Sequence, residues 1–149
     1  MKNIEYLIGP TGISILLGLC AYGSCSGMSL CGCSSTLYAD KGKIVTYSYV
    51  AMIMISTVFF YGFILAIITM NKITDNYKYI TSIWHLSACT LFGMVGCTAG
   101  ISMGKISQSG FRRIAERGEF FMSFLIALAS VEVTLVLAFL CSLLMIYHH

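Results

Sequence analysis

The spacing of charged residues constrains the fold of this chain more than any other feature of its sequence. No Asp, Glu, Lys or Arg occurs in residues 6–39, 44–71 or 79–104, and a fourth such stretch, 120–149, is interrupted only by Glu132. A helix that crosses the hydrocarbon core of a bilayer needs about 20 predominantly apolar residues. Each stretch is long enough for one crossing, so the spacing predicts four membrane-spanning helices.

The composition argues against the main alternatives to a membrane protein. The 149 residues are 58% hydrophobic and 10% charged, with a mean hydropathy of +0.86, whereas soluble domains carry about 25% charged residues. A disordered chain would be richer in charge and poorer in aromatic residues. Nine Lys and Arg residues are too few for a nucleic-acid surface. We therefore expect a chain embedded in lipid, with no nucleic-acid partner.

The expected fold class is an all-α membrane domain over residues 1–149, because the sequence lacks the strict alternation of a membrane β-barrel. The first apolar stretch is longer than a signal-peptide core of about 7–15 residues, so we expect it to be retained. The predicted helices cover about 7–37, 44–71, 79–104 and 120–147. The predicted connections are 40–43, 72–78 and 105–119.

The cations are distributed unevenly between the two ends of the predicted helices. The first and third connections carry Lys41, Lys43, Lys105, Arg112, Arg113 and Arg117. The opposite end carries Lys2, Lys72 and Lys78. Because cytosolic connections carry an excess of Lys and Arg, we expect both termini on the lumenal or exoplasmic side.

Glycines form a similar pattern in the first and third predicted helices. The stretch from Gly23 to Gly27 resembles the stretch from Gly96 to Gly100, and Gly93 and Gly104 extend the second stripe along the same face. Small residues at this spacing let helix backbones approach closely in a membrane. The pattern predicts a tight helix contact and favours a duplicated helical hairpin, although such stripes also occur in unrelated four-helix membrane proteins.

Glu132 is the only charged residue inside a predicted span. An ionised carboxyl at mid-membrane costs roughly 2.5–3.5 kcal/mol on insertion scales, and no Lys or Arg in another span is available to neutralise it. Leu128 and Leu135 share its helical face. The opposite face carries Ser123, Ser130, Thr134 and Cys141. We expect this small polar face to pack against the other helices, leaving Glu132 neutral and directed toward lipid or a partner, as a candidate proton carrier.

With these features the chain resembles the proteolipid c-subunits of the V-type ATPase family over nearly its whole length. The quoted stretches are Gly23 to Gly27, Phe60-Tyr61-Gly62, Gly96-x3-Gly100-x3-Gly104, Gly110-Phe-Arg112 and the run from Phe121 to Glu132-Val133. Ser130-Val131 stands where the family usually has Phe-Ala, so the resemblance is to a divergent member, of the c or c′ type.

The resemblance implies that four helices from a duplicated hairpin assemble side by side with other proteolipid subunits into a rotor ring. A static stator component, the a-subunit, would supply an essential arginine, and central-stalk subunits would join the ring to the ATP-hydrolysing motor. The implied function is proton transport by a vacuolar-type pump, with Glu132 as the essential carboxylate. The chain itself would hold no catalytic centre and no cofactor, and it would lie in a vacuolar or other endomembrane, in contact with membrane lipid.

Oxygen-bearing side chains near Glu132 bear on the choice of ion. Sodium-transporting relatives surround their glutamate with further polar ligands such as glutamine, whereas here Ser56, Thr57 and Thr134 are the obvious hydroxyls at mid-span. Protons are therefore the expected ion. The family also places a tyrosine in the second helix near that depth, which makes Tyr61 a possible hydrogen-bond partner of the protonated acid, or a packing residue.

The cysteines do not form a metal-binding pattern. The seven cysteines lack a CxxC pair, and those inside the spans are expected to act as small apolar residues, so we expect no metal site. The alternative function for the chain is a four-span structural or adaptor protein in which Glu132 only mediates helix packing.

Overall fold

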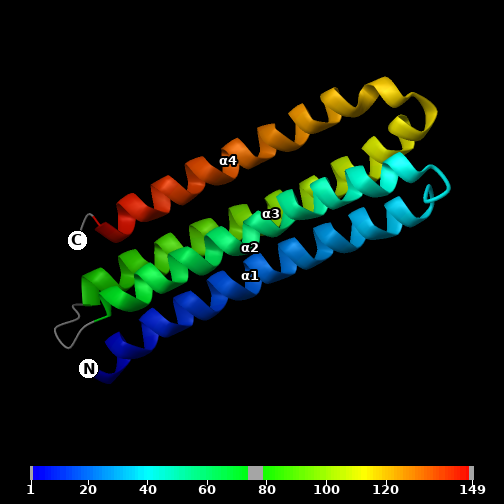
Figure 1. The fold of residues 1–149 in the computed structure, drawn as a ribbon. Helices are drawn as coiled ribbons and strands as arrows, with labels where there is room; N and C mark the ends of the chain where they lie inside the picture. The colour runs from blue at the N-terminus through cyan, green and yellow to red at the C-terminus, as the bar shows by residue number, and fades with distance from the viewer. Residues whose placement is uncertain (1, 74–78, 148–149) are drawn as a thin grey trace.

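A computed structural model describes residues 2–73 and 79–147, and in the first helix it describes side chains from residue 7 onward. The predicted 72–78 connection lies mostly outside the described residues, as do His148 and His149. The described part contains four long helices that run side by side (Figure 1). They are α1 (Lys2–Thr36), α2 (Gly42–Lys72), α3 (Tyr79–Glu116) and α4 (Phe121–Tyr147), with a short 3-10 turn at Gly118–Phe120.

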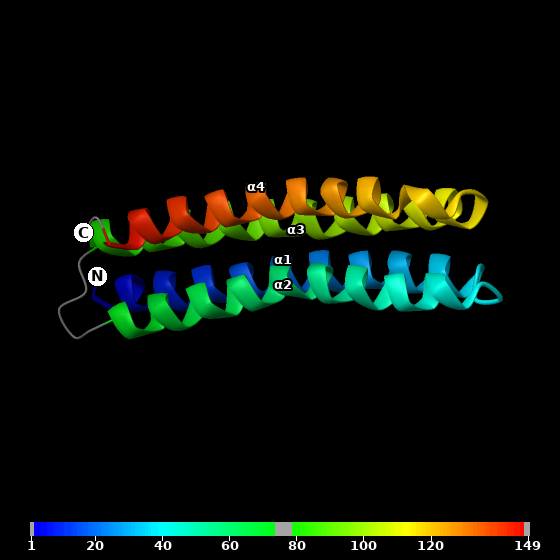
Figure 2. The same cartoon turned by 45° about the horizontal axis from the view of Figure 1, so that its top comes forward.

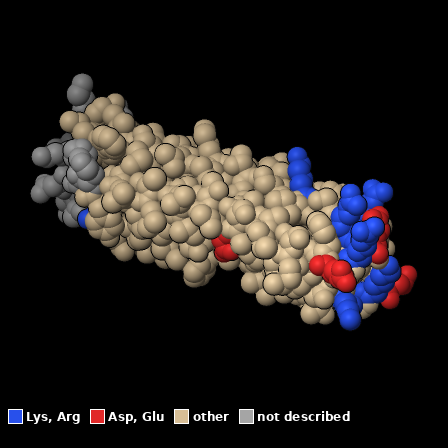
Figure 3. Space-filling view, turned by 90° about the horizontal axis from the view of Figure 1, so that it is seen from above, with Lys and Arg blue, Asp and Glu red and all other residues tan. Residues whose placement is uncertain are grey.

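All four helices are long and apolar enough to cross a membrane. This confirms the four predicted spans and makes the chain a multi-pass membrane protein. Large hydrophobic side chains such as Ile53, Phe60 and Leu144 point outward and are 62–71% exposed. Figure 3 shows the result, a body whose surface is largely free of charge, with most of the charged side chains gathered at one end. Such a surface suits contact with lipid rather than water.

The helices form two antiparallel hairpins, α1–α2 and α3–α4, which lie one above the other in Figure 2. The most extensive contact in the molecule joins α1 to α3. Helix α2 packs on both of them, and α4 packs on α3 and more lightly on α2. Over the described residues α1 and α4 do not touch, so one face of α3 is left open between them.

Glycines bring α1 and α3 into backbone contact. A Cβ atom added at Gly23 would lie 2.6 Å from the Cα atom of Cys97, and one added at Gly104 would lie 2.7 Å from the Cα atom of Gly27. A Cβ at Gly27 or Gly100 would collide with the backbone of the facing helix. Real Cβ atoms do not tolerate such distances, so only glycine permits this approach.

Two further glycines of α3 face side chains rather than backbone. A Cβ atom at Gly93 would lie 3.1 Å from Leu19, and one at Gly96 would lie 3.0 Å from the sulfur of Cys20. The stripe on α3 therefore has two parts. Gly100 and Gly104 face backbone atoms and do not tolerate a larger residue, whereas Gly93 and Gly96 face side chains that can adjust.

Helix α3 is longer than the sequence pattern predicts. We expect it to end near 104, but it continues without interruption to Glu116. The prediction used charge to mark the end of the helix, whereas charge marks only the end of the apolar stretch. Residues between Lys105 and Glu116 include no proline, and backbone hydrogen bonds sustain a helix in water as well as in lipid.

Candidate functional site

Glu132 lies near the middle of α4. Among the described residues it is the only acidic residue that is distant from both ends of its helix. Figure 3 shows a small acidic patch midway along the otherwise uncharged body. Helix α4 has about seven turns, and Glu132 is the single charged residue among them.

The face of α4 that packs against the bundle is the opposite of the expected one. Leu128 and Leu135 are fully buried, and Glu132, which lies between them in sequence and beside them on the helix, is half-buried. The polar residues Ser123, Ser130, Thr134 and Cys141 are all exposed. The prediction that the small polar face packs inward is therefore wrong.

The hydroxyl groups explain this reversal. Ser130 donates a hydrogen bond to the carbonyl of Ile126 (2.9 Å), and Thr134 donates one to the carbonyl of Ser130 (3.3 Å). Because each hydroxyl is satisfied within its own helix, these residues gain little from a neighbouring helix. The larger leucines make more dispersion contacts when they pack, so their face turns inward.

An aromatic cluster shows which neighbour Glu132 turns toward. The centroid of the Phe139 ring lies 5.4 Å from that of Tyr61 on α2 and 5.9 Å from that of Phe92 on α3. Glu132 precedes Phe139 by seven residues, or about two helical turns, and so lies on nearly the same face. Glu132 is therefore on the flank of α4 that borders α2, which we call the α2–α4 seam.

The three possible supporting residues lie as follows. Tyr61 is in the seam, where its ring contacts the ring of Phe139. The hydroxyl of Ser56 is exposed and donates to the carbonyl of Ile53 at 2.7 Å. Thr134 is on the polar face of α4, away from the seam. Within residues 2–73 and 79–147, the Glu132 carboxyl has no hydrogen bond or ion pair.

The polar face of α4 borders a shallow groove on the other side of the helix. Thr98 and Ser102 of α3 line this groove together with Ser130 and Thr134 of α4, around a volume of about 380 Å³. Glu132 is not among the lining residues. The hydroxyl groups at mid-span are thus gathered on one flank of α4 and the carboxyl on the other.

Sequence reasoning missed the aromatic cluster and the inward leucines. A signal was present, because Phe139, Leu135 and Leu128 recur at helical spacing around Glu132 and mark one continuous face. The sequence did not show which helix that face meets, since this depends on the order in which the four helices pack.

The site lies within the part of the chain that matches a known family. Residues 86–145, covering most of α3 and α4, match the family model that describes the C-subunit of ATP synthase. The chain is 24% identical over 135 residues to the 16 kDa proteolipid c-subunit of the V-type proton ATPase of Rattus norvegicus, covering 89% of this chain and 87% of the relative.

Other relatives carry related names. The human 16 kDa proteolipid c-subunit of the V-type proton ATPase is 23% identical over 123 residues, covering 82% of this chain and 79% of the relative. The V-type proton ATPase c-subunit of Candida tropicalis is 23% identical over 114 residues, covering 76% and 69%. These matches agree with the four apolar helices of the fold and with the resemblance drawn from the sequence motifs. The chain is a distant member of the V-type ATPase proteolipid c-subunit family.

Proposed function

We propose that this chain is a proton-carrying subunit of the rotor ring of a vacuolar-type ATP-driven proton pump, with Glu132 as the proton-binding residue. The observation that carries the proposal is an acidic side chain at mid-span that has no hydrogen-bond or ion-pair partner among the described residues. An intramembrane acid of this kind is expensive to insert and is therefore expected to be functional.

The chemistry of such a carboxyl follows from its surroundings. Leu128, Leu135 and Phe139 flank Glu132 and offer no cation, and an ionised carboxyl at mid-membrane is costly in the absence of one. The carboxylate form would be favoured where the side chain meets water or a positive charge. A neutral acid that crosses lipid and ionises beside a cation moves one proton in each cycle.

The partners that this mechanism requires are other proteolipid subunits in a ring and a static stator component, the a-subunit, whose arginine unloads the proton. Central-stalk subunits would connect the ring to the subunits that hydrolyse ATP. Moving one proton against 100 mV requires about 2.3 kcal/mol, and members of this family have no catalytic site of their own, so the driving energy comes from those subunits.

The proposed ion is the proton, because Ser56 and Thr134 direct their hydroxyl hydrogens to their own helices and do not assemble a cage of oxygens around Glu132. The proposed location is a vacuolar or other endomembrane. The basic end, which carries Lys41, Lys105 and Arg113, would face the cytosol and the termini the lumen.

The test replaces Glu132 with glutamine in a pump that contains no other copy of the subunit. Glu132→Gln keeps the shape but cannot release a proton, so we expect proton transport to be abolished while the ring still assembles. Glu132→Asp should retain part of the transport, and Glu119→Gln, at an exposed acid in the turn before α4, should retain all of it. Acidification of sealed vesicles measures transport, and retained pumping in Glu132→Gln would refute the proposal.

The same site separates this function from the adaptor alternative. A carbodiimide reacts with a protonated carboxyl in an apolar setting, so we expect selective labelling of Glu132 and a parallel loss of pumping. A packing role would instead leave assembly and proton transport unchanged in Glu132→Gln, because glutamine keeps the shape and can still form hydrogen bonds. The absence of a partner for the carboxyl within the described residues favours the carrier over the packing role.

A further inference from the structure

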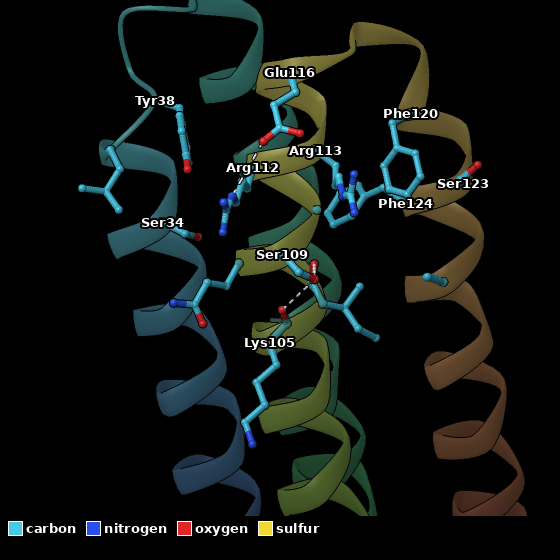
Figure 4. A pocket seen from close by; sticks show the side chains of 15 residues that line it. Ser34, Tyr38, Lys105, Ser109, Arg112, Arg113, Glu116, Phe120, Ser123 and Phe124 are labelled. Atoms are coloured by element: carbon cyan, nitrogen blue, oxygen red, sulfur yellow. Dashed lines mark hydrogen bonds and ion pairs between the residues drawn. The ribbon is translucent and has the colours of Figure 1, made fainter.

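A cavity at the charged end of the molecule has a separate chemistry. It occupies about 960 Å³ on the open face of α3, between the end of α1 and the start of α4. Lys105, Arg112 and Arg113 of α3 contribute three cations to its lining, and Glu116 contributes the single acid (Figure 4). The cavity is therefore strongly electropositive.

Two of the three cations are not neutralised within the described chain. Arg112 pairs with Glu116 at 3.7 Å, one helical turn away, in an exposed ion pair. Lys105 and Arg113 have no ion pair in the part of the chain that the structure describes. In Figure 4, Arg112 extends on the side of Tyr38 and Arg113 on the side of Phe120, so cations border the cavity on both sides.

The depth of the cavity matches that of phospholipid headgroups. Lys105 directly follows the uncharged stretch 79–104, so it marks the level at which the hydrocarbon ends. Arg113, the second cation that has no ion pair among the described residues, lies eight residues further along α3, which is about 12 Å. The headgroup layer on each side of a bilayer is about 5–8 Å thick, so a lipid phosphate would lie between these cations.

The same face of α3 continues into the membrane as the shallow groove described above. Thr98 and Ser102 precede Lys105 by seven and three residues, which places all three on one helical face. Thr98 directs its hydroxyl hydrogen to carbonyls of its own helix, as Ser130 does across the groove. The groove therefore presents carbon surface to its occupant, which suits an acyl chain.

From this arrangement we propose that the cavity binds the phosphorylated headgroup of an anionic phospholipid, whose acyl chain lies along the open face of α3. Lys105 and Arg113 contact the phosphate, and the hydroxyls of Ser109 and Ser123 lie within the same lining. The site is independent of proton carriage, because Glu132 lies on the other flank of α4.

The experiment titrates the purified full chain, in its natural assembly state, with phosphatidylinositol phosphate or with phosphatidylcholine of the same chain length. Native mass spectrometry counts the lipids bound. We expect Lys105→Gln with Arg113→Gln to lower the affinity for the anionic lipid about thirtyfold, since two cations at the membrane surface are lost. The pair Lys105→Arg with Arg113→Lys should bind as the unmodified chain does.

The matched control is Lys43→Gln with Arg117→Gln, which removes two exposed cations at the same end but outside this cavity. Its affinity should change less than about twofold. An equal loss in the control would refute the site in favour of diffuse charge attraction. Equal binding of phosphatidylcholine would refute headgroup recognition.

Two further outcomes would also overturn the proposal. If soluble inositol phosphate binds as tightly as the lipid, the ligand is a free anion and no lipid is required. If the assembled complex shows a neighbouring proteolipid or a stalk protein filling the cavity, that protein is the occupant. If the double glutamine variant fails to assemble, the lipid affinities of Arg113→Gln and Arg117→Gln are compared instead. The proposal then requires a larger loss of affinity in Arg113→Gln.

Discussion

The most extensive helix contact of the bundle and the slightest one are built in opposite ways. Helices α1 and α3 meet backbone to backbone at Gly23, Gly27 and Gly100. Helices α2 and α4 share much less contact and meet through large side chains such as Tyr61 and Phe139. A contact made by backbone has no room to adjust, whereas one made by side chains can repack. Glu132 lies on the flank of α4 that borders the contact made by side chains.

The largest expected effect comes from adding one carbon atom to the rigid contact. Gly100→Ala places a Cβ against the backbone of Gly23, and α1 must move to accommodate it. We expect a loss of about 3 kcal/mol, at the upper end for overpacking, measured as the free energy of unfolding in mixed micelles.

The control for this prediction is Gly18→Ala on α1, because a Cβ at Gly18 meets no atom within 4 Å. Its stability should be unchanged or slightly raised, since alanine favours helix by about 1 kcal/mol over glycine. Equal stability of Gly100→Ala and Gly18→Ala would show that the two contacts do not differ in rigidity.

A smaller effect is expected from a deletion in the α2–α4 seam. Leu135 is fully buried, and Leu135→Ala should cost about 1–2 kcal/mol. This is less than the roughly 2–5 kcal/mol found in soluble cores, because lipid chains are as apolar as leucine and only packing is lost. Leu137→Ala, at a leucine that is 57% exposed on the same helix, serves as the control and should stay within about 0.5 kcal/mol. A cost for Leu135→Ala as large as that for Gly100→Ala would contradict the comparison.

The smallest effect concerns the Tyr61 hydroxyl. Tyr61→Phe keeps the ring against Phe139, so stability should change by less than about 0.5 kcal/mol and proton transport should persist. Tyr61→Ala should cost roughly 0.5–1.5 kcal/mol through the lost aromatic pair. If Tyr61→Phe keeps its stability but loses transport, the hydroxyl takes part in proton binding and the seam is more than a packing contact.

Much of this architecture could be predicted from the sequence. The gaps between charges indicated the four spans, since the thickness of a bilayer sets a minimum apolar length. The glycines at 23, 27, 100 and 104 lie at the closest approach of α1 and α3, as small residues do in membranes. The spans follow from the thickness of the lipid layer, and the glycine contact follows from the small size of glycine.

The orientation of α4 could not be predicted in the same way. A rule that polar residues face inward in a membrane protein fails when Ser130 and Thr134 are already satisfied by their own helix. The length of α3 was also missed, because the boundary of the lipid and the boundary of the helix are different physical limits. In both cases the helix itself was predicted. The errors concern which face of α4 packs inward and how far α3 extends beyond the lipid.

The extension of α3 beyond Lys105 has a mechanical consequence. With 38 residues the helix is about 57 Å long, so a substantial part stands clear of a hydrocarbon layer of about 30 Å. The Lys41 ammonium donates a hydrogen bond to the carbonyl of Ala115, near the C-terminal end of α3. This bond fixes the end of α3 to the α1–α2 hairpin. In a rotating assembly, a stiff helix held in this way would transmit a lateral force to the bundle. An unstructured loop in its place would bend under the same force.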